Sequence, residues 1–231
     1  MSTVWIVTRP YVLLSVAISV DGFIDDPNVR KFPLSNAADF DRVDQVRAES
    51  DAILIGAETV RTDNPRLLVN SAERRSARMA KGLPEYPLKI TVTRTGDLDP
   101  ELQFWHHGGA KLVYTTDSGR VAASANLGGL AEVVALGTDI DFGALLDDLG
   151  TRGVDRLMVE GGGRMHTAFL SAGLADEIHL AIAPLLIGEA TAPRFLNPAE
   201  FPGGPTRRFH LADVAQVGDV AVLRYFPKVT T

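Results

Sequence analysis

The 231-residue sequence contains no cysteine, and this absence removes several kinds of chemistry at once. Without thiols there are no disulfides, no thiolate metal ligands and no cysteine nucleophile. The sequence also lacks a Gly-x-Ser-x-Gly motif, which weighs against a hydrolase. Residues 1–10 show no basic segment followed by an apolar run, and no apolar run is long enough to cross a bilayer. We therefore expect a cytoplasmic protein without a membrane anchor.

Positive charge is not in excess either. Lysine and arginine number 23 against 29 aspartates and glutamates, so the formal net charge is −6. An acidic balance argues against broad nucleic-acid binding, which needs a basic surface. Hydrophobic residues make up 45% and charged residues 23%, which is typical of globular proteins. The length suits one α/β domain, and we expect residues 1–231 to form it, with residues 1–10 as an N-terminal extension.

Short apolar runs alternate with amphipathic segments along most of the chain. The runs predict strands at 11–20, 52–56, 88–93, 111–115, 131–136 and 155–159. Helices are predicted from Ser35-Asn36 onward, at 57–61, near 73–79, at 142–149 and up to about residue 172. In the first of these helices Ala37, Phe40 and Val43 predict the apolar face. Strands at 177–183, 209–216 and 220–226 then follow one another, the last two around Gly218-Asp219. This order predicts an α/β fold with a mostly parallel sheet and an antiparallel C-terminal hairpin.

A glycine triplet, Gly161-Gly162-Gly163, connects a predicted buried strand to a predicted helix. Glycines permit close backbone approach, and the free amides at a helix start attract phosphate. A dinucleotide diphosphate therefore suits this turn. The alternative is a tight strand-to-helix turn with no ligand. The full Rossmann fingerprint fails, because His166 occupies its last glycine position.

Two further segments place polar side chains at the carboxyl ends of predicted strands, where ligands bind in open α/β sheets. The segment 56–65 carries Thr59 and Asp63. Thr93-Arg94-Thr95 offers a guanidinium between two hydroxyls, and a guanidinium matches the oxygens of a 2′-phosphate. Taken alone, a capped loop and a solvated strand end explain these two segments better than a ligand does.

In combination, these segments resemble the pyrimidine reductases of riboflavin biosynthesis. The matching segments are Ser19-Val20-Asp21-Gly22, residues 47–56, Thr59, residues 63–67, residues 159–163, residues 176–178 and residues 183–188. Their order is also that of the family, and the resemblance spans about residues 11–226.

The resemblance implies a dihydrofolate-reductase-like fold that binds NADPH, with helices on both faces of the mixed sheet. The family reduces the ribosyl side chain of 5-amino-6-(5-phosphoribosylamino)uracil, or of its 2,5-diamino pyrimidinone analogue, to the ribitylamino product. Hydride passes from C4 of the nicotinamide to C1′ of the sugar, which is present as an imine in the ring-opened form. The resemblance also implies a homodimer, with the antiparallel end of the sheet near the interface.

Motif positions carry residue roles over from the family. Cofactor contacts are implied for Thr59, Thr93, Arg94, Gly161, Gly162, Gly163 and Arg164. Substrate contacts are implied for Ser19, Asp21, Arg47, Asp63, Arg66, Leu67 and Glu160. Asp63 and Glu160 are the candidates for catalytic acid or base. No metal is expected, because His106-His107 has no evident third ligand.

Three departures from the family leave the substrate open. Val16 stands where many members carry a lysine, and Asn70 stands at a frequent arginine. Residues 31–35 replace a serine-tryptophan segment, so Lys31, Arg47 or Arg66 would have to compensate in binding the phosphate. Two other hypotheses follow: a reductase of dihydrofolate or another pterin, and a nucleotide-binding module without catalysis. The lack of cysteine leaves no zinc site for the deaminase reaction that often accompanies this reductase.

Overall fold

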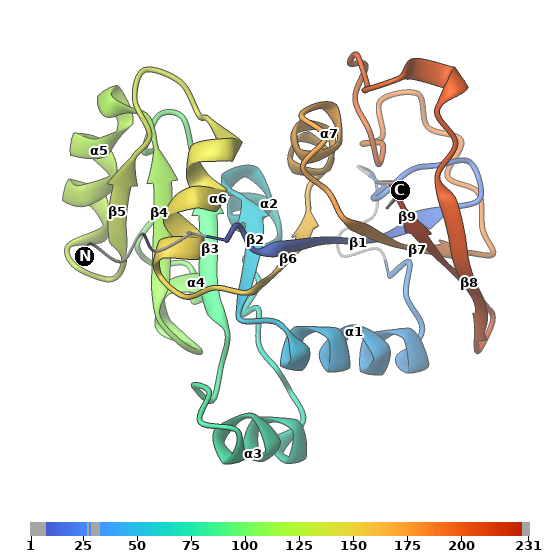
Figure 1. Cartoon of the computed structure of the whole chain (residues 1–231), viewed down its shortest axis with the longest axis horizontal. Helices are drawn as coiled ribbons and strands as arrows, with labels where there is room; N and C mark the ends of the chain where they lie inside the picture. Colours follow the sequence, from blue (N-terminus) through green and yellow to red (C-terminus); the bar gives the residue numbers. More distant parts are fainter. Residues whose placement is uncertain (1–7, 27, 29–32, 228–231) are drawn as a thin grey trace, which may run out of the picture.

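The computed structural model describes residues 8–26, 28 and 33–227. These residues contain one nine-stranded sheet with the strand order β5-β4-β3-β2-β6-β1-β7-β9-β8 (Figure 1). The pairs from β5 to β7 are parallel, whereas β9 pairs antiparallel with both β7 and β8. The predicted mostly parallel sheet with an antiparallel C-terminal hairpin is thus confirmed.

The elements follow the predicted order closely. The strands are β1 (Tyr11–Ser19), β2 (Ala52–Gly56), β3 (Leu88–Val92), β4 (Lys111–Thr115), β5 (Glu132–Ala135), β6 (Arg156–Gly161), β7 (Glu177–Ala183), β8 (His210–Val217) and β9 (Val220–Phe226). The helices are α1 (Ala37–Glu49), α2 (Ala57–Asp63), α3 (Ala72–Ala80), α4 (Gln103–His106), α5 (Asp117–Leu127), α6 (Phe142–Thr151), α7 (Gly163–Ser171) and the short 3₁₀ helix η1 (Gly204–Thr206). None of the helices in this part of the chain is long and apolar enough to cross a membrane.

Helices cover both faces of the sheet, as predicted. Successive strand residues point to opposite faces, so Leu13 and Leu14 of β1 enter two different cores. Leu14 packs in the core that includes side chains of α6 and α7, and Leu13 in the core that includes side chains of α1, α2, α4 and α5. Figure 1 shows α1 and α7 on opposite sides of the central strands. This double burial explains why the central strands are continuous apolar runs in the sequence.

The predicted apolar face of α1 was only partly right: Val43 packs against a buried core, but Ala37 is exposed. Phe40 is 58% exposed, whereas Asp39 and Asp44 are buried. Asp44 is satisfied inside the protein, because it accepts hydrogen bonds from the backbone amides of Asn70 and Ser71 and from Arg74. Apolar periodicity misled here because a helix can bury carboxylates when the surrounding segments supply the donors.

Helix α5 was not predicted. Thr116 caps it by accepting a 3.1 Å hydrogen bond from the amide of Gly119. The buried residues of α5 are Gly119, Ala123 and Leu127. Because two of the three are very small, the helix shows little of the apolar periodicity from which the other helices were predicted.

The carboxyl ends of three neighbouring strands meet at one edge of the sheet. Gly56 of β2 pairs in register with Val92 of β3, and Ile55 of β2 pairs with Gly161 of β6. Because these strands are parallel, the segments that follow them leave the sheet at the same edge. The fold therefore brings the polar segments after Gly56, Val92 and Glu160 together, although the sequence separates them widely.

Candidate functional site

A cleft of about 2130 Å³ opens at this edge of the sheet. Most of the residues predicted from the sequence to form the site line it: Arg47, Thr59, Asp63, Arg66, Thr93, Arg94, Glu160, Gly161, Gly162, Gly163 and Arg164. Asp39 and Phe40, near the start of α1, also line the cleft. Clefts of this kind at the carboxyl ends of parallel strands are the usual ligand sites of α/β folds.

The glycine turn lies directly against the loop that carries Thr59. A Cβ atom on Gly162 would lie 3.1 Å from Thr59 Oγ1, and one on Gly163 would lie 2.4 Å from the carbonyl oxygen of Arg194. Gly161 has a φ of 151°, which side chains with a Cβ rarely adopt. No side chain caps the start of α7, so its first amides and the helix dipole face the cleft. The turn is therefore a suitable place for a phosphate group.

Arg47 of α1 and Glu160 of β6 bind each other at two points. Arg47 Nε and Nη2 each lie 2.6 Å from a carboxylate oxygen of Glu160, and Arg47 Nη1 donates to the carbonyl of Leu68 at 3.0 Å. Both side chains are largely buried, with 19% and 12% exposed. Burial opposes the charge on Arg47, but attraction by Glu160 holds the pKa of Arg47 above its ordinary value. The pairing orients both carboxylate oxygens of Glu160 toward Arg47.

Asp63 ends α2 on the wall of the same cleft. Thr62 Oγ1 lies 3.0 Å from its Oδ1 atom. Its carboxylate is accessible from the cleft, yet the surrounding protein desolvates it enough to raise its pKa, and repulsion by Asp25 acts in the same direction. Asp63 therefore holds a proton more readily than an ordinary aspartate does.

The segment after β3 supplies the positive charge at one end of the cleft. Arg94 pairs with Asp139, and both side chains are mostly exposed. Such a surface pair contributes only about 0–1 kcal/mol, so a phosphate can take the place of the carboxylate. Thr93 is buried, and its hydroxyl accepts a hydrogen bond from the amide of Gly96 at 3.2 Å. Arg66 and Arg164 also line the cleft, and neither forms an ion pair with the described residues.

Three predicted substrate residues do not line the cleft. Ser19 Oγ donates to Asp21 Oδ1 at 2.5 Å, and Asp21 accepts from the amides of Ile187 and Gly188. These contacts join the end of β1 to the loop after β7. Leu67 is buried with a φ of 49° and turns the chain after α2. Their contact with substrate stays a prediction, and Lys31 lies outside the described residues.

Sequence analysis missed two buried charged residues near the site. Lys89 of β3 is 1% exposed and donates to the carbonyls of Arg66 at 2.9 Å, His107 at 3.0 Å and Phe104. Burial lowers the pKa of Lys89 to about 7. Its contact with Arg66 anchors the segment that follows Asp63. A lysine inside an apolar strand was the available signal. Asp39, the second, gave no such signal, because an acidic residue in the first turn of a helix already suits the helix dipole.

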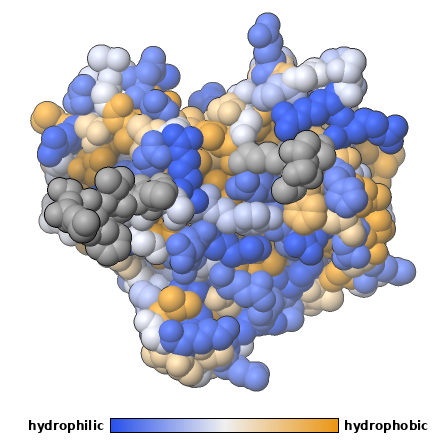
Figure 2. Space-filling model, in the orientation of Figure 1, coloured by the Kyte–Doolittle hydropathy of each residue, from blue (hydrophilic) through white to orange (hydrophobic). Residues whose placement is uncertain are grey.

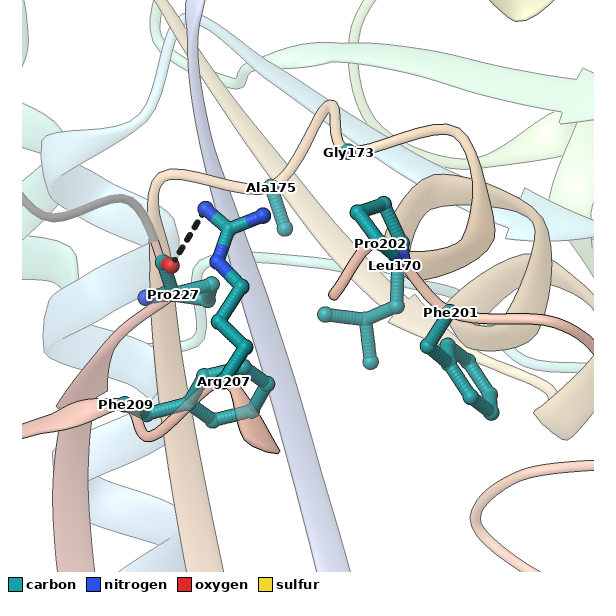
Figure 3. Close-up of a pocket in the computed structure, with 8 residues that line it drawn as sticks. All are labelled: Leu170, Gly173, Ala175, Phe201, Pro202, Arg207, Phe209 and Pro227. Atoms are coloured by element: carbon teal, nitrogen blue, oxygen red, sulfur yellow. Dashed lines mark hydrogen bonds between the residues drawn. The ribbon is translucent and has the colours of Figure 1, made fainter. Parts of the chain in front are cut away.

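A second cavity, away from the strand ends, has a volume of only about 30 Å³. Figure 3 shows its mostly apolar lining and the guanidinium of Arg207, which donates to the carbonyl of Pro227 at 2.9 Å. This volume is about that of a single water molecule in the liquid, so the cavity is too small for a nucleotide. In the part of the chain that the structure describes, no group of His, Asp and Glu is arranged to hold a metal ion.

Sequence comparisons identify relatives across most of the chain. The family model described as the RibD C-terminal domain matches residues 10–223. The 2,5-diamino-6-ribosylamino-4(3H)-pyrimidinone 5′-phosphate reductase of Archaeoglobus fulgidus is 36% identical over 194 residues, which cover 84% of this chain and 89% of the relative. The protein of the same name from Methanothermobacter thermautotrophicus is 33% identical over 181 residues, covering 78% and 80%.

Structural comparisons agree with these relatives. A pyrimidine reductase-like protein from Corynebacterium diphtheriae superposes with a TM-score of 0.77 at 24% identity, covering 94% of this chain and 91% of its own. Acinetobacter baumannii RibD superposes with a TM-score of 0.78 at 25% identity, covering 96% of this chain and 59% of its own. The first likeness is evidence for the fold alone. Together with the sequence matches, they show that the fold described above is shared with RibD-type reductases.

Proposed function

Because the chain belongs to the RibD C-terminal domain family, we propose that it is an NADPH-dependent reductase of a phosphorylated ribosylaminopyrimidine in riboflavin biosynthesis. Its curated relatives reduce 2,5-diamino-6-ribosylamino-4(3H)-pyrimidinone 5′-phosphate, as their names state. The observation that carries the proposal is the contact between the glycine turn and Thr59, with Asp63 and Glu160 in the same cleft. We further propose that the described residues form a single reductase domain.

The residues of the cleft fit a nicotinamide dinucleotide. The uncapped start of α7 suits the diphosphate. The absence of side chains at Gly162 and Gly163 lets the turn pack closely against Thr59 and the backbone of Arg194. Arg94 lies where a 2′-phosphate would replace Asp139, which favours NADPH over NADH. The bound cofactor supplies a hydride from C4 of its nicotinamide.

The two candidate catalytic carboxyls differ in environment, and this difference assigns them different roles in the proposal. Reduction of the ring-opened imine adds a hydride to C1′ and a proton to the imine nitrogen. Asp63, whose pKa is raised, is the better donor of that proton. Glu160 is oriented by its two hydrogen bonds with Arg47 and can accept hydrogen bonds from substrate hydroxyl or amine groups.

A direct assay tests the function. Purified protein is incubated with NADPH and the pyrimidine phosphate, and loss of nicotinamide absorbance is followed together with the ribitylamino product. Substrate reduction is expected, and Asp63→Asn should lower kcat at least about 100-fold if Asp63 supplies the proton. Cofactor binding without reduction of any panel substrate would favour the non-catalytic alternative. Turnover of dihydrofolate in place of the pyrimidine would favour a pterin reductase.

Cofactor choice has its own test. Arg94→Ala should weaken NADPH binding by about tenfold or more and leave NADH binding nearly unchanged, because only NADPH carries the 2′-phosphate. Calorimetry with both cofactors measures the two affinities. Equal losses would show that Arg94 does not read the phosphate.

We also propose that the protein forms a homodimer through the antiparallel end of the sheet. The edge strand β8 is largely exposed, with Leu211 at 46% and Val214 at 60%. Figure 2 shows hydrophobic side chains along the right-hand side of the molecule, where Figure 1 places the C-terminal strands. Exposed apolar edges favour pairing with another chain. Val214→Lys should give monomers in light scattering, whereas Val121→Lys, at a residue 77% exposed on α5, should not.

A further inference from the structure

Asp39 carries a buried carboxylate oxygen with nothing to bind. The side chain is 0% exposed, and its Oδ2 atom has no hydrogen-bond partner among the described residues. Its Oδ1 atom accepts from Arg42 Nε at 2.7 Å. Leaving an acceptor buried and unpaired costs free energy, so such an atom calls for a donor from outside the described residues. Asp39 lines the cleft, which is where that donor can come from.

The secondary structure does not account for this carboxylate. Asn36 caps α1, and its Oδ1 accepts from the backbone amide of Asp39 at 2.8 Å. The capping role in the first turn is therefore already filled, and the carboxylate of Asp39 turns inward instead. Asp44, one turn further on, is also buried but has its oxygens satisfied by Arg74 and two backbone amides. Asp39 differs from Asp44 because its Oδ2 atom accepts no hydrogen bond from the described residues.

Resting on the proposed function, we propose that Asp39 recognises the 2-amino and N3–H edge of the pyrimidine and makes this reductase selective for the 2,5-diamino pyrimidinone. That edge presents two adjacent N–H donors. The open Oδ2 atom of Asp39 can accept one of them, and Oδ1, which already accepts from Arg42, has a second lone pair for the other. The deaminated uracil has a carbonyl oxygen in place of the 2-amino group. A carboxylate facing that oxygen would meet a second acceptor, so the uracil form is disfavoured.

The position of Asp39 on α1 suits this role. Asp39, Val43 and Arg47 are spaced four residues apart, so they lie along one side of the helix, and all three line the cleft. At a rise of 1.5 Å per residue, Asp39 and Arg47 are about 12 Å apart along the axis. This is roughly the length of a phosphoribosylaminopyrimidine. The base can therefore reach Asp39 while the phosphoribosyl group extends toward Arg47 and Glu160.

The neighbours of Asp39 orient its carboxylate. Arg42, which holds Oδ1, also lies 3.4 Å from Nδ1 of His179 on β7. His179 pairs in register with Ser15 of β1, another residue of the cleft wall. Oδ1 is thus tied to the sheet through Arg42, and Oδ2 is left for the ligand.

The test compares both pyrimidine phosphates on the wild type, Asp39→Asn and the control Asp41→Asn. Asp41 lies on the outer side of α1, 70% exposed and paired with Arg74. The wild type should have the higher kcat/KM for the diamino substrate. Asp39→Asn should lower that value about 10- to 100-fold, leave the value for the uracil form unchanged or raised, and leave the KM for NADPH unchanged. The control should behave as the wild type.

Substrate preference separates recognition from folding, because a partly unfolded variant loses activity on both substrates equally. Equal losses in Asp39→Asn, or a wild type that prefers the uracil form, would overturn the proposal. If the wild type reduces neither substrate, the proposed function fails. Recognition of the pyrimidine edge by Asp39 is then tested by binding alone. Calorimetry in the presence of NADPH should then show 2,6-diaminopyrimidin-4-one binding more tightly than 6-aminouracil to the wild type but not to Asp39→Asn. Absence of that difference overturns the recognition.

Discussion

Arg47 and Glu160, separated by 113 residues in the sequence, form a two-point ion pair with both N–O distances at 2.6 Å. The pair joins α1 to the end of β6 immediately before the glycine turn. It therefore fixes α1 relative to the glycine turn in the wall of the cleft. Two residues that were each expected to meet the substrate separately act as one unit.

Replacing one residue of this pair should lower the free energy of unfolding more than replacing both residues. Glu160→Gln leaves the charge of Arg47 largely buried without its partner, so the free energy of unfolding should fall by about 3 kcal/mol. The double variant Arg47→Met with Glu160→Leu should recover much of this loss, since neither charge remains. Urea unfolding measures both. A double variant that is less stable than the single one would show that the pair contributes mainly attraction.

Gly163→Ala should disrupt the glycine turn. Its Cβ would lie 2.4 Å from the carbonyl oxygen of Arg194, so the backbone has to move. We expect NADPH affinity to fall at least about tenfold, because the amides of α7 shift away from the diphosphate. Gly128→Ala is the control: its φ is 54° and no atom lies within 4 Å of the added Cβ. That variant should lose about 1–2 kcal/mol of stability but no cofactor affinity, as calorimetry and thermal unfolding would show.

Asp63 should make both stability and activity depend on pH. Desolvation raises its pKa, so its contribution to stability is present at low pH and is lost as the pH rises through its folded-state pKa. Asp63→Asn should therefore be more stable than the wild type near pH 7 and lose that advantage in acid. The pH profile of kcat/KM should also lose one ionisation in this variant. An unchanged profile would rule out Asp63 as the proton donor.

Glu177 should govern acid stability. Burial opposes its charge, but hydrogen bonds with His179, Arg224 and Tyr11 lower its pKa from 4.5 to about 2. A lowered pKa stabilises the fold above the ordinary value of 4.5, and this stabilisation disappears as the pH falls toward 2. Glu177→Gln should thus lose about 3 kcal/mol at pH 7 and unfold with a flatter pH dependence between these values.

The matched control for Glu177 is Glu132→Gln. Glu132 also pairs with an arginine, Arg152, but its side chain is 58% exposed. An exposed pair contributes about 0–1 kcal/mol, so this variant should unfold almost as the wild type does at every pH. Thermal unfolding from pH 2 to pH 7 distinguishes the two. Similar losses in both variants would contradict the role assigned to burial.

The sequence predicted well those elements whose residue types are fixed by local requirements and not by which side chains pair across the fold. A strand segment buried on both faces must be apolar, so β2 and the central residues of β6, Leu157, Met158 and Val159, were evident from the sequence alone. The glycine turn was also evident, because a φ of 151° at Gly161 and the close approach at Gly162 and Gly163 leave little choice of residue. The order of these segments was enough to indicate the family.

What only the tertiary structure decided is how the polar side chains pair. The sequence showed Arg47 and Glu160 but not that they bind each other, because pairing depends on distance across the folded sheet. It showed Asp39 in the first turn of α1 but not that this side chain is buried, because apolar periodicity assumes that buried residues are apolar. Burial of a carboxylate is decided by the donors that other segments bring to it, and those positions exist only after the chain has folded.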